Sequence, residues 1–534
     1  MKKITNPITL LVCLTIWAFS SVSAASEAEF GKLSKAWTLH ADGSQEFRCQ
    51  KELTLFTHTA MNGTYGETFI VYNPAYQELK IHSSYTRQKD GTIVKTPDNA
   101  FVEVLPREAA DAPAYNQLKE MVVVHTGLEL GATIYLDYSI LTQPGHEPEL
   151  DIDDRLQETS PVKTYTATVS VPAGKPLAWD LSGTKAQPAE TSRDGMKAFV
   201  WTLHNVPALS REAYTPKNGN HTIRLAVSTY PSPAGALSVL DKRFKDSKAY
   251  ECKTFAPYLT EQAKDENEKI QLLQKHVVEH MGNSQVSLDH AGYTVRDADA
   301  VLRSAYGTAA EKAQLLCVLL NAAGVPAEVV ASYPALLKPE AMGLKAIKEL
   351  AVKTTCNGKE KYLSPVSLHD PAFTLRGDLD RVYTLDGKEI RIPAVPVQIQ
   401  EEKEVAVDAS KAVGGYVVCT LPASSQGVNA WYMSALNTQR KTVMEIPSLI
   451  RETVTYTVTP ADGLKLKTTA ASARLAKPCG EVTQTVRPKG DKIEVVRTIE
   501  LNQLQFTPAE YADLRALLNE WSDPNQRVLL FSAP

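Results

Sequence analysis

Residues 305–330 read AYGTAAEKAQLLCVLLNAAGVPAEVV, and this stretch decides how the middle of the chain is interpreted. Thr308-Ala309-Ala310-Glu311 forms a capping box, so we expect Thr308 to be the N-cap and Ala309 the first helical residue. Gly324 is expected to end the helix. The expected buried side of the helix comprises Leu315, Leu316, Leu319, Leu320 and Ala323. The pattern therefore predicts a turn, a helix and then a strand.

The cysteine in this stretch is in the wrong place to be activated by the helix. A helix N-terminus carries a partial positive charge that favours an anion, and thiolate nucleophiles are often placed there with a lowered pKa. Cys317 follows Ala309 by eight positions, which is about 12 Å along a helix. Its neighbours Leu316 and Val318 are apolar. We expect Cys317 to be a small buried residue and not a nucleophile.

The stretch resembles the core of the transglutaminase-like superfamily, a papain-like thiol fold. The pattern of that family is a glycine, one residue, the nucleophilic cysteine, an acidic residue, and a helix ending in a small-Gly-hydrophobic turn. The matching residues are Gly307, Glu311, Ala313, Leu315, Leu316, Ala323, Gly324 and Val325. Ala309 stands where the cysteine belongs.

The resemblance also locates the other two catalytic positions of the family. Its histidine begins the next core strand, here KELAVKTTC, and its aspartate precedes the proline of the following strand, here EKYLSPVS. By spacing, these positions are Glu349 and Ser364, so all three catalytic roles are vacant. The resemblance therefore implies a non-catalytic protein that binds a peptide or glycan in the retained groove, or acts as a scaffold.

The flanking regions complete an α+β multidomain architecture. The region before the core shows alternating strands such as KTYTATVSV and resembles a β domain of unknown function in exported bacterial proteins, for example at Leu128-Glu129-Leu130-Gly131. The region after the core resembles the β domain that follows such cores, and Thr507-Pro508-Ala509-Glu510 predicts the start of a terminal helix. We expect a signal peptide at residues 1–24, an antiparallel β domain at 25–232, the core at 233–378, and a C-terminal β domain with a terminal helix at 379–534.

Two enzymatic alternatives remain open. An active thiol protease or acyltransferase would need a different alignment, for which Cys317, His369 and Asp370 are the candidate triad. The segment His276-Val277-Val278-Glu279-His280, within a predicted helix at 260–282, matches the H-x-x-E-H motif of zinc peptidases, in which both histidines bind the metal and the glutamate activates water. A motif with three fixed positions arises often by chance, so no metal or other cofactor is expected.

The ends and the overall charge restrict the environment and the partners. Lys2 and Lys3 precede an apolar run that ends in small residues near Ala24, which predicts a signal peptide and export to the periplasm or the medium. No later segment is long and apolar enough to span a membrane.

Without those two lysines the net charge changes from -4 to -6, and no basic stretch favours nucleic acid. A peptide, protein or glycan partner is expected. The six cysteines after Cys13 show no CxxC spacing, and their pairing is open.

Overall fold

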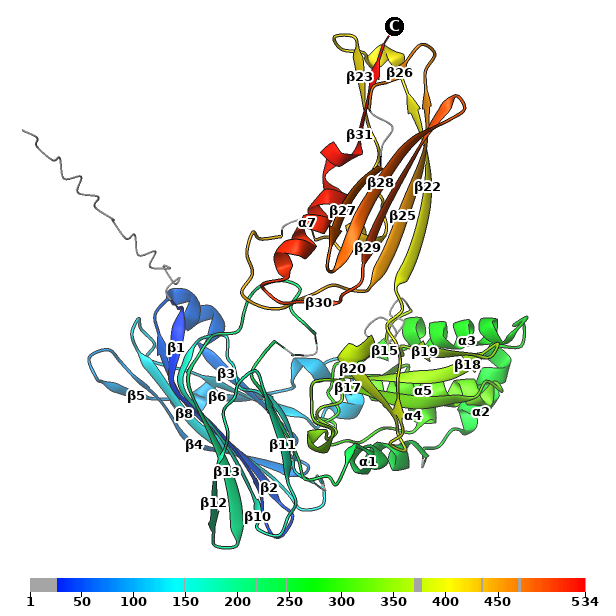
Figure 1. Ribbon diagram of the computed structural model, residues 1–534. Coiled ribbons are helices and arrows are strands. Elements are labelled where there is room, and N and C mark those ends of the chain that lie inside the picture. Colours follow the sequence, from blue (N-terminus) through cyan, green and yellow to red (C-terminus); the bar gives the residue numbers. More distant parts are fainter. Residues whose placement is uncertain are drawn as a thin grey trace, which may run out of the picture.

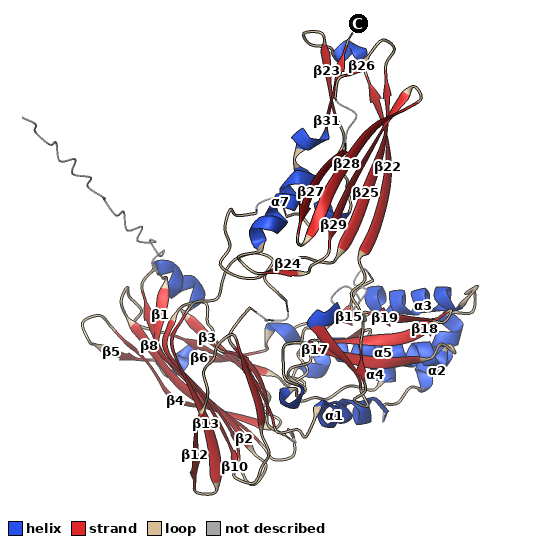
Figure 2. Ribbon diagram, viewed as in Figure 1, coloured by secondary structure: helices blue, strands red, loops and turns tan. Residues whose placement is uncertain are grey.

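The structure is a computed structural model that describes residues 26–147, 149–217, 219, 221–245, 247–368, 377–433, 436–468 and 472–533. The chain forms three parts in sequence order (Figure 1). The first part, drawn in blue to blue-green, packs beside the green core, and the yellow-to-red part follows the core. Helices gather in the core, whereas the two flanking parts consist mainly of strands (Figure 2). The multidomain α+β fold predicted from the sequence is therefore confirmed.

The N-terminal part contains an eight-stranded sheet and two three-stranded sheets. The large sheet runs in the order β12 (Ala189–Arg193), β13 (Met196–Val206), β10 (Val162–Pro172), β1 (Ala28–Leu39), β2 (Gln45–Leu55), β8 (Thr133–Thr142), β4 (Gln77–Arg87) and β5 (Ile93–Lys95). One small sheet has the order β11 (Ala178–Ser182), β14 (Arg224–Ser228) and β9 (Asp151–Arg155). The other has the order β3 (Glu67–Tyr72), β7 (Lys119–Val124) and β6 (Phe101–Val104).

Side-chain alternation places the core of this part on one face of the large sheet. Along β10 the buried residues are Tyr165, Ala167, Val169 and Val171, as the period of two predicts. The expectation of a purely antiparallel domain is wrong in one place, because β1 pairs with β10 in parallel. A parallel pair needs a long crossover connection, and most of the domain lies between these two strands in the sequence.

The core consists of helices packed on a five-stranded sheet. The sheet order is β19 (Lys359–Leu363), β18 (Glu349–Cys356), β17 (Ala327–Pro334), β20 (Asp380–Thr384) and β21 (Glu389–Ile390). The helices are α1 (Pro233–Lys245), α2 (Tyr250–Leu259), α3 (Glu266–Lys275), α4 (Ala298–Ser304) and α5 (Ala309–Ala322). A short parallel pair, β15 (Gly282–Asn283) and β16 (Tyr306–Gly307), leads into α5. Helix α5 is central, since it contacts β17, β18 and the helices α2, α3 and α4.

The C-terminal part is a second β domain with its own hydrophobic core. Its main sheet runs β22 (Val397–Val407), β25 (Ile450–Pro460), β29 (Lys492–Leu501), β28 (Gly480–Lys489) and β27 (Ser472–Lys477). A three-stranded sheet has the order β23 (Tyr416–Thr420), β31 (Val528–Ser532) and β26 (Lys465–Leu466). A two-stranded sheet pairs β24 (Met444–Glu445) with β30 (Gln505–Phe506). The helix α6 (Gly427–Ala430) is short, and α7 (Tyr511–Ser522) packs on β27 and β28.

Two helices differ from the sequence expectation. The capping box before α7 forms, since the Glu510 carboxylate accepts from the Thr507 N–H at 2.8 Å, but residues 508–510 form a turn and the α-helix begins only at Tyr511. The predicted helix at 260–282 is α3 followed by a π-helical turn, His276–His280. Local capping signals fix where a helix starts only to within a turn, because the first turn is often irregular.

None of the helices in the described ranges combines the length and the apolar character needed to cross a bilayer. Across those same ranges, all six cysteines carry free thiols. The segment predicted to be a signal peptide lies outside the described residues.

Candidate functional site

The head of α5 opens onto a pocket. Thr308 is the N-cap: its hydroxyl accepts from the Glu311 N–H at 3.3 Å, and the Glu311 carboxylate accepts from the Thr308 N–H at 2.9 Å. Ala309, the first helical residue, is exposed. It lines a cavity of about 380 Å³ together with Thr308, Ala310, Glu349 and Leu350. The position where the family resemblance expects a nucleophile therefore faces open space, as a catalytic position would.

Two of the three positions that the resemblance assigns to catalytic residues reach this pocket. Ala309 and Glu349 both line it, whereas Ser364 is fully buried and is not among its lining residues. The Ser364 hydroxyl accepts from the Val366 N–H at 3.3 Å.

Strand alternation decides which residue of β18 faces α5. Leu350 and Val352 join the hydrophobic cluster that contains the buried side of α5, while Ala351 joins the cluster on the opposite face of the sheet. Successive side chains of a strand point to opposite faces. A histidine acting on a nucleophile at Ala309 would have to share the face of Leu350. Neither Leu350 nor its neighbour Glu349 supplies an imidazole.

Cys317 lies in a different pocket. Its thiol is half-buried and donates to the Ala327 carbonyl at 3.3 Å. Burial, together with the nearby charge of Glu328, raises the pKa of this thiol to about 12. The residues lining the Cys317 pocket, such as Phe244 and Leu385, include no histidine in the described ranges. His369 and Asp370, the other members of the alternative triad, lie outside the described residues.

The histidines of the zinc-peptidase motif lie side by side, with their ring centroids 5.5 Å apart. Burial lowers the pKa of His276, and the proximity of His280 lowers it further. The ring of His276 also packs on Phe255, with 4.8 Å between centroids. Within the described ranges, no group of three or more His, Cys, Asp or Glu side chains is placed to hold a metal ion. Among the described residues, the motif thus has its two histidines near each other and no third side chain placed to complete a metal site.

Glu311 connects the head of α5 to the N-terminal part through a hydrogen bond, a role that the sequence did not indicate. Arg296 donates to both carboxylate oxygens, at 2.8 and 2.9 Å, and the Tyr115 hydroxyl donates at 2.7 Å. Burial opposes ionisation of Glu311, but these hydrogen bonds outweigh it and keep its pKa below the ordinary value. Glu311 and Tyr115 are 196 residues apart in the chain, so no local pattern signals their contact.

Further contacts fix the N-terminal part against the core around the same pocket. The Tyr306 hydroxyl accepts from the Ala114 N–H at 2.8 Å, and the His290 ring lies 2.5 Å from the Glu108 carboxylate. Asp151 of β9 also accepts from the N–H of Lys345, which lines the pocket, at 2.8 Å. The pocket is therefore built by two parts of the chain and depends on their fixed arrangement.

Gly343 is required at this junction because no side chain fits there. A Cβ at this position would lie 2.1 Å from Oδ1 and 2.3 Å from Cγ of Asp151. The Asp151 carboxylate is buried and bonded to the Lys345 N–H, so it cannot move away without losing that bond. Gly343→Ala is expected to lower the free energy of unfolding by about 1–3 kcal/mol, measured by denaturant unfolding. Gly174→Ala, where a Cβ meets nothing within 4 Å, is the control. Equal stability of the two variants would contradict this account of the junction.

Three family models match the chain in order. A domain of unknown function, DUF3857, matches residues 41–210, the transglutaminase-like superfamily core matches residues 253–354, and a second domain of unknown function, DUF3858, matches residues 416–531. No curated protein matches the chain.

The chain is similar to several solved structures. The crystal structure of a protein named "putative protease" from Parabacteroides distasonis is 61% identical, with a TM-score of 0.86, and the match covers 95% of this chain and 99% of that chain. A "putative cysteine protease" from Cytophaga hutchinsonii is 12% identical over 45% of this chain and 85% of that one, with a TM-score of 0.20. The periplasmic domain of TgpA from Pseudomonas aeruginosa is 15% identical over 41% of this chain and 70% of that one, with a TM-score of 0.17. The last two similarities are too weak to support a conclusion.

The match to the Parabacteroides protein spans almost the whole of both chains, and the three family models lie in the same order as the three parts of the structure. The chain therefore belongs to the transglutaminase-like superfamily, with its core between a DUF3857 and a DUF3858 domain.

Proposed function

We propose that this chain is an exported, non-catalytic member of the superfamily that binds a peptide at the head of α5 without cleaving it. The observation that carries the proposal is Ala309: it is the first residue of α5, it is exposed, and it lines the pocket where a thiol nucleophile would act. The apolar N-terminal run that follows Lys2 and Lys3 supports export.

The residues at this site cannot carry out acyl transfer by a thiol nucleophile. Acyl transfer needs a thiolate that attacks the carbonyl carbon, an imidazole that moves the proton, and a group that orients the imidazole. The methyl group of Ala309 cannot attack, and neither Glu349 nor Leu350 is an imidazole. Loss of the nucleophile alone typically reduces the rate by several orders of magnitude.

The same site retains what is needed to hold a peptide. The first N–H groups of a helix have no partner within it. The N–H of Glu311 donates to the Thr308 hydroxyl, and the N–H of Lys312 donates to the Thr308 carbonyl. This leaves the N–H groups of Ala309 and Ala310 at the pocket. These donors, together with the positive end of the helix dipole, suit a peptide carbonyl or carboxylate oxygen. A peptide is favoured over a glycan because its main chain supplies such acceptors at every residue.

The name of the Parabacteroides relative suggests a competing function, proteolysis. Both functions are tested with a mixture of fluorescent peptides incubated with the mature protein, with binding followed by polarisation and cleavage by mass spectrometry. We expect binding without cleavage. Ala309→Trp should weaken binding at least about tenfold, because the indole would fill the pocket, and it should leave stability nearly unchanged because the site is exposed.

The control variant for this experiment is Cys317→Ser, which lies in the other pocket and should bind peptide as the wild type does. Turnover by the wild type that disappears in Cys317→Ser would overturn the proposal in favour of a thiol enzyme. Absence of any peptide binding would also overturn it.

A further inference from the structure

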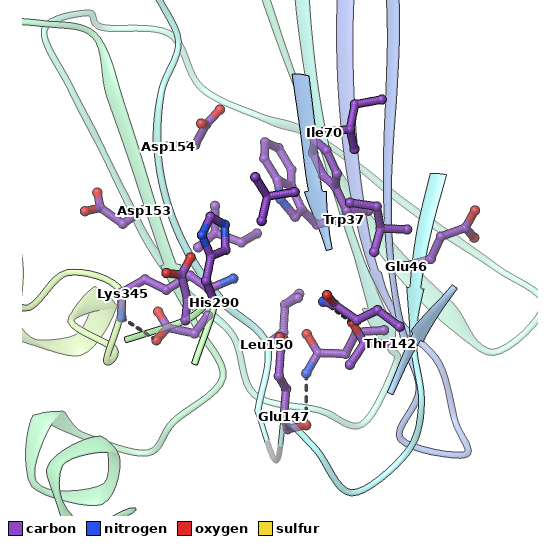
Figure 3. Close-up of a pocket in the computed structure, with 18 of the residues that line it drawn as sticks. Trp37, Glu46, Ile70, Thr142, Glu147, Leu150, Asp153, Asp154, His290 and Lys345 are labelled. Atoms are coloured by element: carbon purple, nitrogen blue, oxygen red, sulfur yellow. Dashed lines mark hydrogen bonds between the residues drawn. The ribbon is translucent and has the colours of Figure 1, made fainter. Parts of the chain in front are cut away.

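A second cavity continues from the pocket at the head of α5 toward the N-terminal sheet. Its volume is about 410 Å³, and it shares Asp153, Asp289 and Lys345 with the α5 pocket, so the two form one groove. In Figure 3, His290 and Lys345 approach the cavity from the core side, and Trp37 and Glu46 lie across it on the sheet side. We call this second cavity the sheet pocket.

Aromatic side chains form one wall of the sheet pocket. Trp37 and Phe47 pack with ring centroids 5.5 Å apart, and Phe47 and Tyr138 follow at 6.1 Å. Phe69 also lines the pocket and is 57% exposed. Such a wall suits an alkyl chain that ends in a cation, because ring faces attract cations and apolar surface accommodates the methylene groups.

The carboxylates of the sheet pocket are only partly neutralised by the protein. Asp153 is paired with Arg224, and Asp154 with Lys35 at 2.9 Å. Glu147 and Asp289 have no cationic side chain within 4.0 Å in the described part of the chain.

Asp151 adds a buried acceptor to this set. Its side chain is only 5% exposed and lines the sheet pocket, and its Oδ1 has no hydrogen-bond partner among the described residues. This oxygen is closed off from solvent and lies against Gly343, so an ionised Asp151 would favour a cation in the groove through its charge and not through a direct hydrogen bond from Oδ1.

The pKa of Lys345 reflects the negative electrostatic potential inside the groove. Burial by itself lowers the pKa of a lysine, yet the pKa of Lys345 is raised, because Glu147, Asp289 and Asp151 lie around it. No carboxylate of the described residues forms an ion pair with its ammonium group. Among the described residues that line the sheet pocket, Lys345 is the one lysine or arginine, and Glu147 and Asp289 oppose its charge, with Asp151 in addition when it is ionised. The groove therefore keeps a negative potential.

We propose that the sheet pocket takes a lysine or arginine side chain of a peptide whose main chain lies at the head of α5. This assignment rests on the proposed function of the groove and names the class of its ligand. A metal ion does not fit, since no group of three metal-binding side chains is found within the described residues. The aromatic wall would hold the alkyl stem, and Glu147 and Asp289 would face the cation, with Asp151 adding negative charge when it is ionised.

The test measures equilibrium binding of four fluorescein-labelled octapeptides to the full mature chain. The peptides are identical except for Lys, Arg, Gln or Glu at the central position, and N-acetyl-lysine amide serves as a competitor. We expect the Lys and Arg peptides to bind about tenfold or more tightly than the Gln peptide, with a preference that falls as salt is added. N-acetyl-lysine amide should compete far more weakly than the unlabelled Lys peptide.

Variants locate the preference on the protein. Glu147→Gln and Asp289→Asn should each reduce the Lys-over-Gln ratio about three- to tenfold, while Glu404→Gln, an equal loss of charge on the exposed face of β22, should leave it unchanged. Equal binding of the Lys and Gln peptides, with both lost in Ala309→Trp, would overturn the cation assignment and leave the proposed function standing. Equal affinity for N-acetyl-lysine amide and the Lys peptide would overturn the peptide part of the assignment. No binding of any peptide would overturn the proposed function itself.

Discussion

Replacing Glu311 by alanine is expected to destabilise the core by about 3–5 kcal/mol, because it leaves the Arg296 guanidinium without its buried partner. Glu311 is fully buried and also accepts from Tyr115, so the change removes a contact between the N-terminal part and the core at the same time. Hydrogen exchange of the α5 amides measures this locally, and we expect their exchange to be accelerated about 100-fold or more.

Glu510 offers a matched control for that experiment. It occupies the same place in a capping box, accepting from the Thr507 N–H at 2.8 Å before α7, but it is exposed and pairs with no arginine in the described ranges. Glu510→Ala should therefore cost only about 1 kcal/mol or less in the exchange of the α7 amides. If the two variants shifted exchange equally, the buried ion pair would contribute nothing beyond capping.

Replacing Asp151 by asparagine is expected to change how stability depends on pH. Burial raises the pKa of Asp151 to about 7 in the folded chain, against about 3.9 in an unfolded one. Between these values the folded state binds more protons, so the wild type loses stability as pH rises from about 4 to 7. The full penalty, about 4 kcal/mol, applies above pH 7. Asparagine keeps an acceptor for the Lys345 N–H and does not titrate.

The variant should therefore be more stable than the wild type at pH 8 and gain little or nothing at pH 4. Thermal unfolding of both proteins across this range measures the difference. Asp491→Asn, an exposed position in the turn between β28 and β29, should differ from the wild type by the same small amount at every pH. A constant difference between Asp151→Asn and the wild type from pH 4 to 8 would show that Asp151 does not titrate in this window.

The elements predicted best from the sequence are those whose signals are local. Thr308 and Glu311 specify the start of α5 through two hydrogen bonds within four residues, and the structure begins the helix at Ala309 as predicted. The alternation along β10 likewise predicts which residues are buried. The start of α7 was predicted three residues too early, because its capping box closes an irregular turn before the helix begins.

The features that sequence reasoning missed depend on residues far apart in the chain. The sequence identifies Glu311 as a capping residue and as a match to the family pattern, but neither indicates its contacts with Arg296 and Tyr115. The groove likewise combines Asp151 and Trp37 with Lys345, and no periodic pattern connects them. The choice between Glu349 and Leu350 needed the pairing of β18, because a shift of one residue moves a side chain to the other face of a sheet.

A groove that binds a peptide and leaves it intact must show both properties in the same sample. The most direct test is to titrate the mature protein with the labelled Lys octapeptide and then recover the peptide for mass spectrometry, in parallel with Ala309→Trp and Cys317→Ser. We expect saturable binding by the wild type and Cys317→Ser, loss of binding in Ala309→Trp, and intact peptide throughout. Cleaved or transamidated peptide in the wild-type sample, absent from the Cys317→Ser sample, would contradict this expectation.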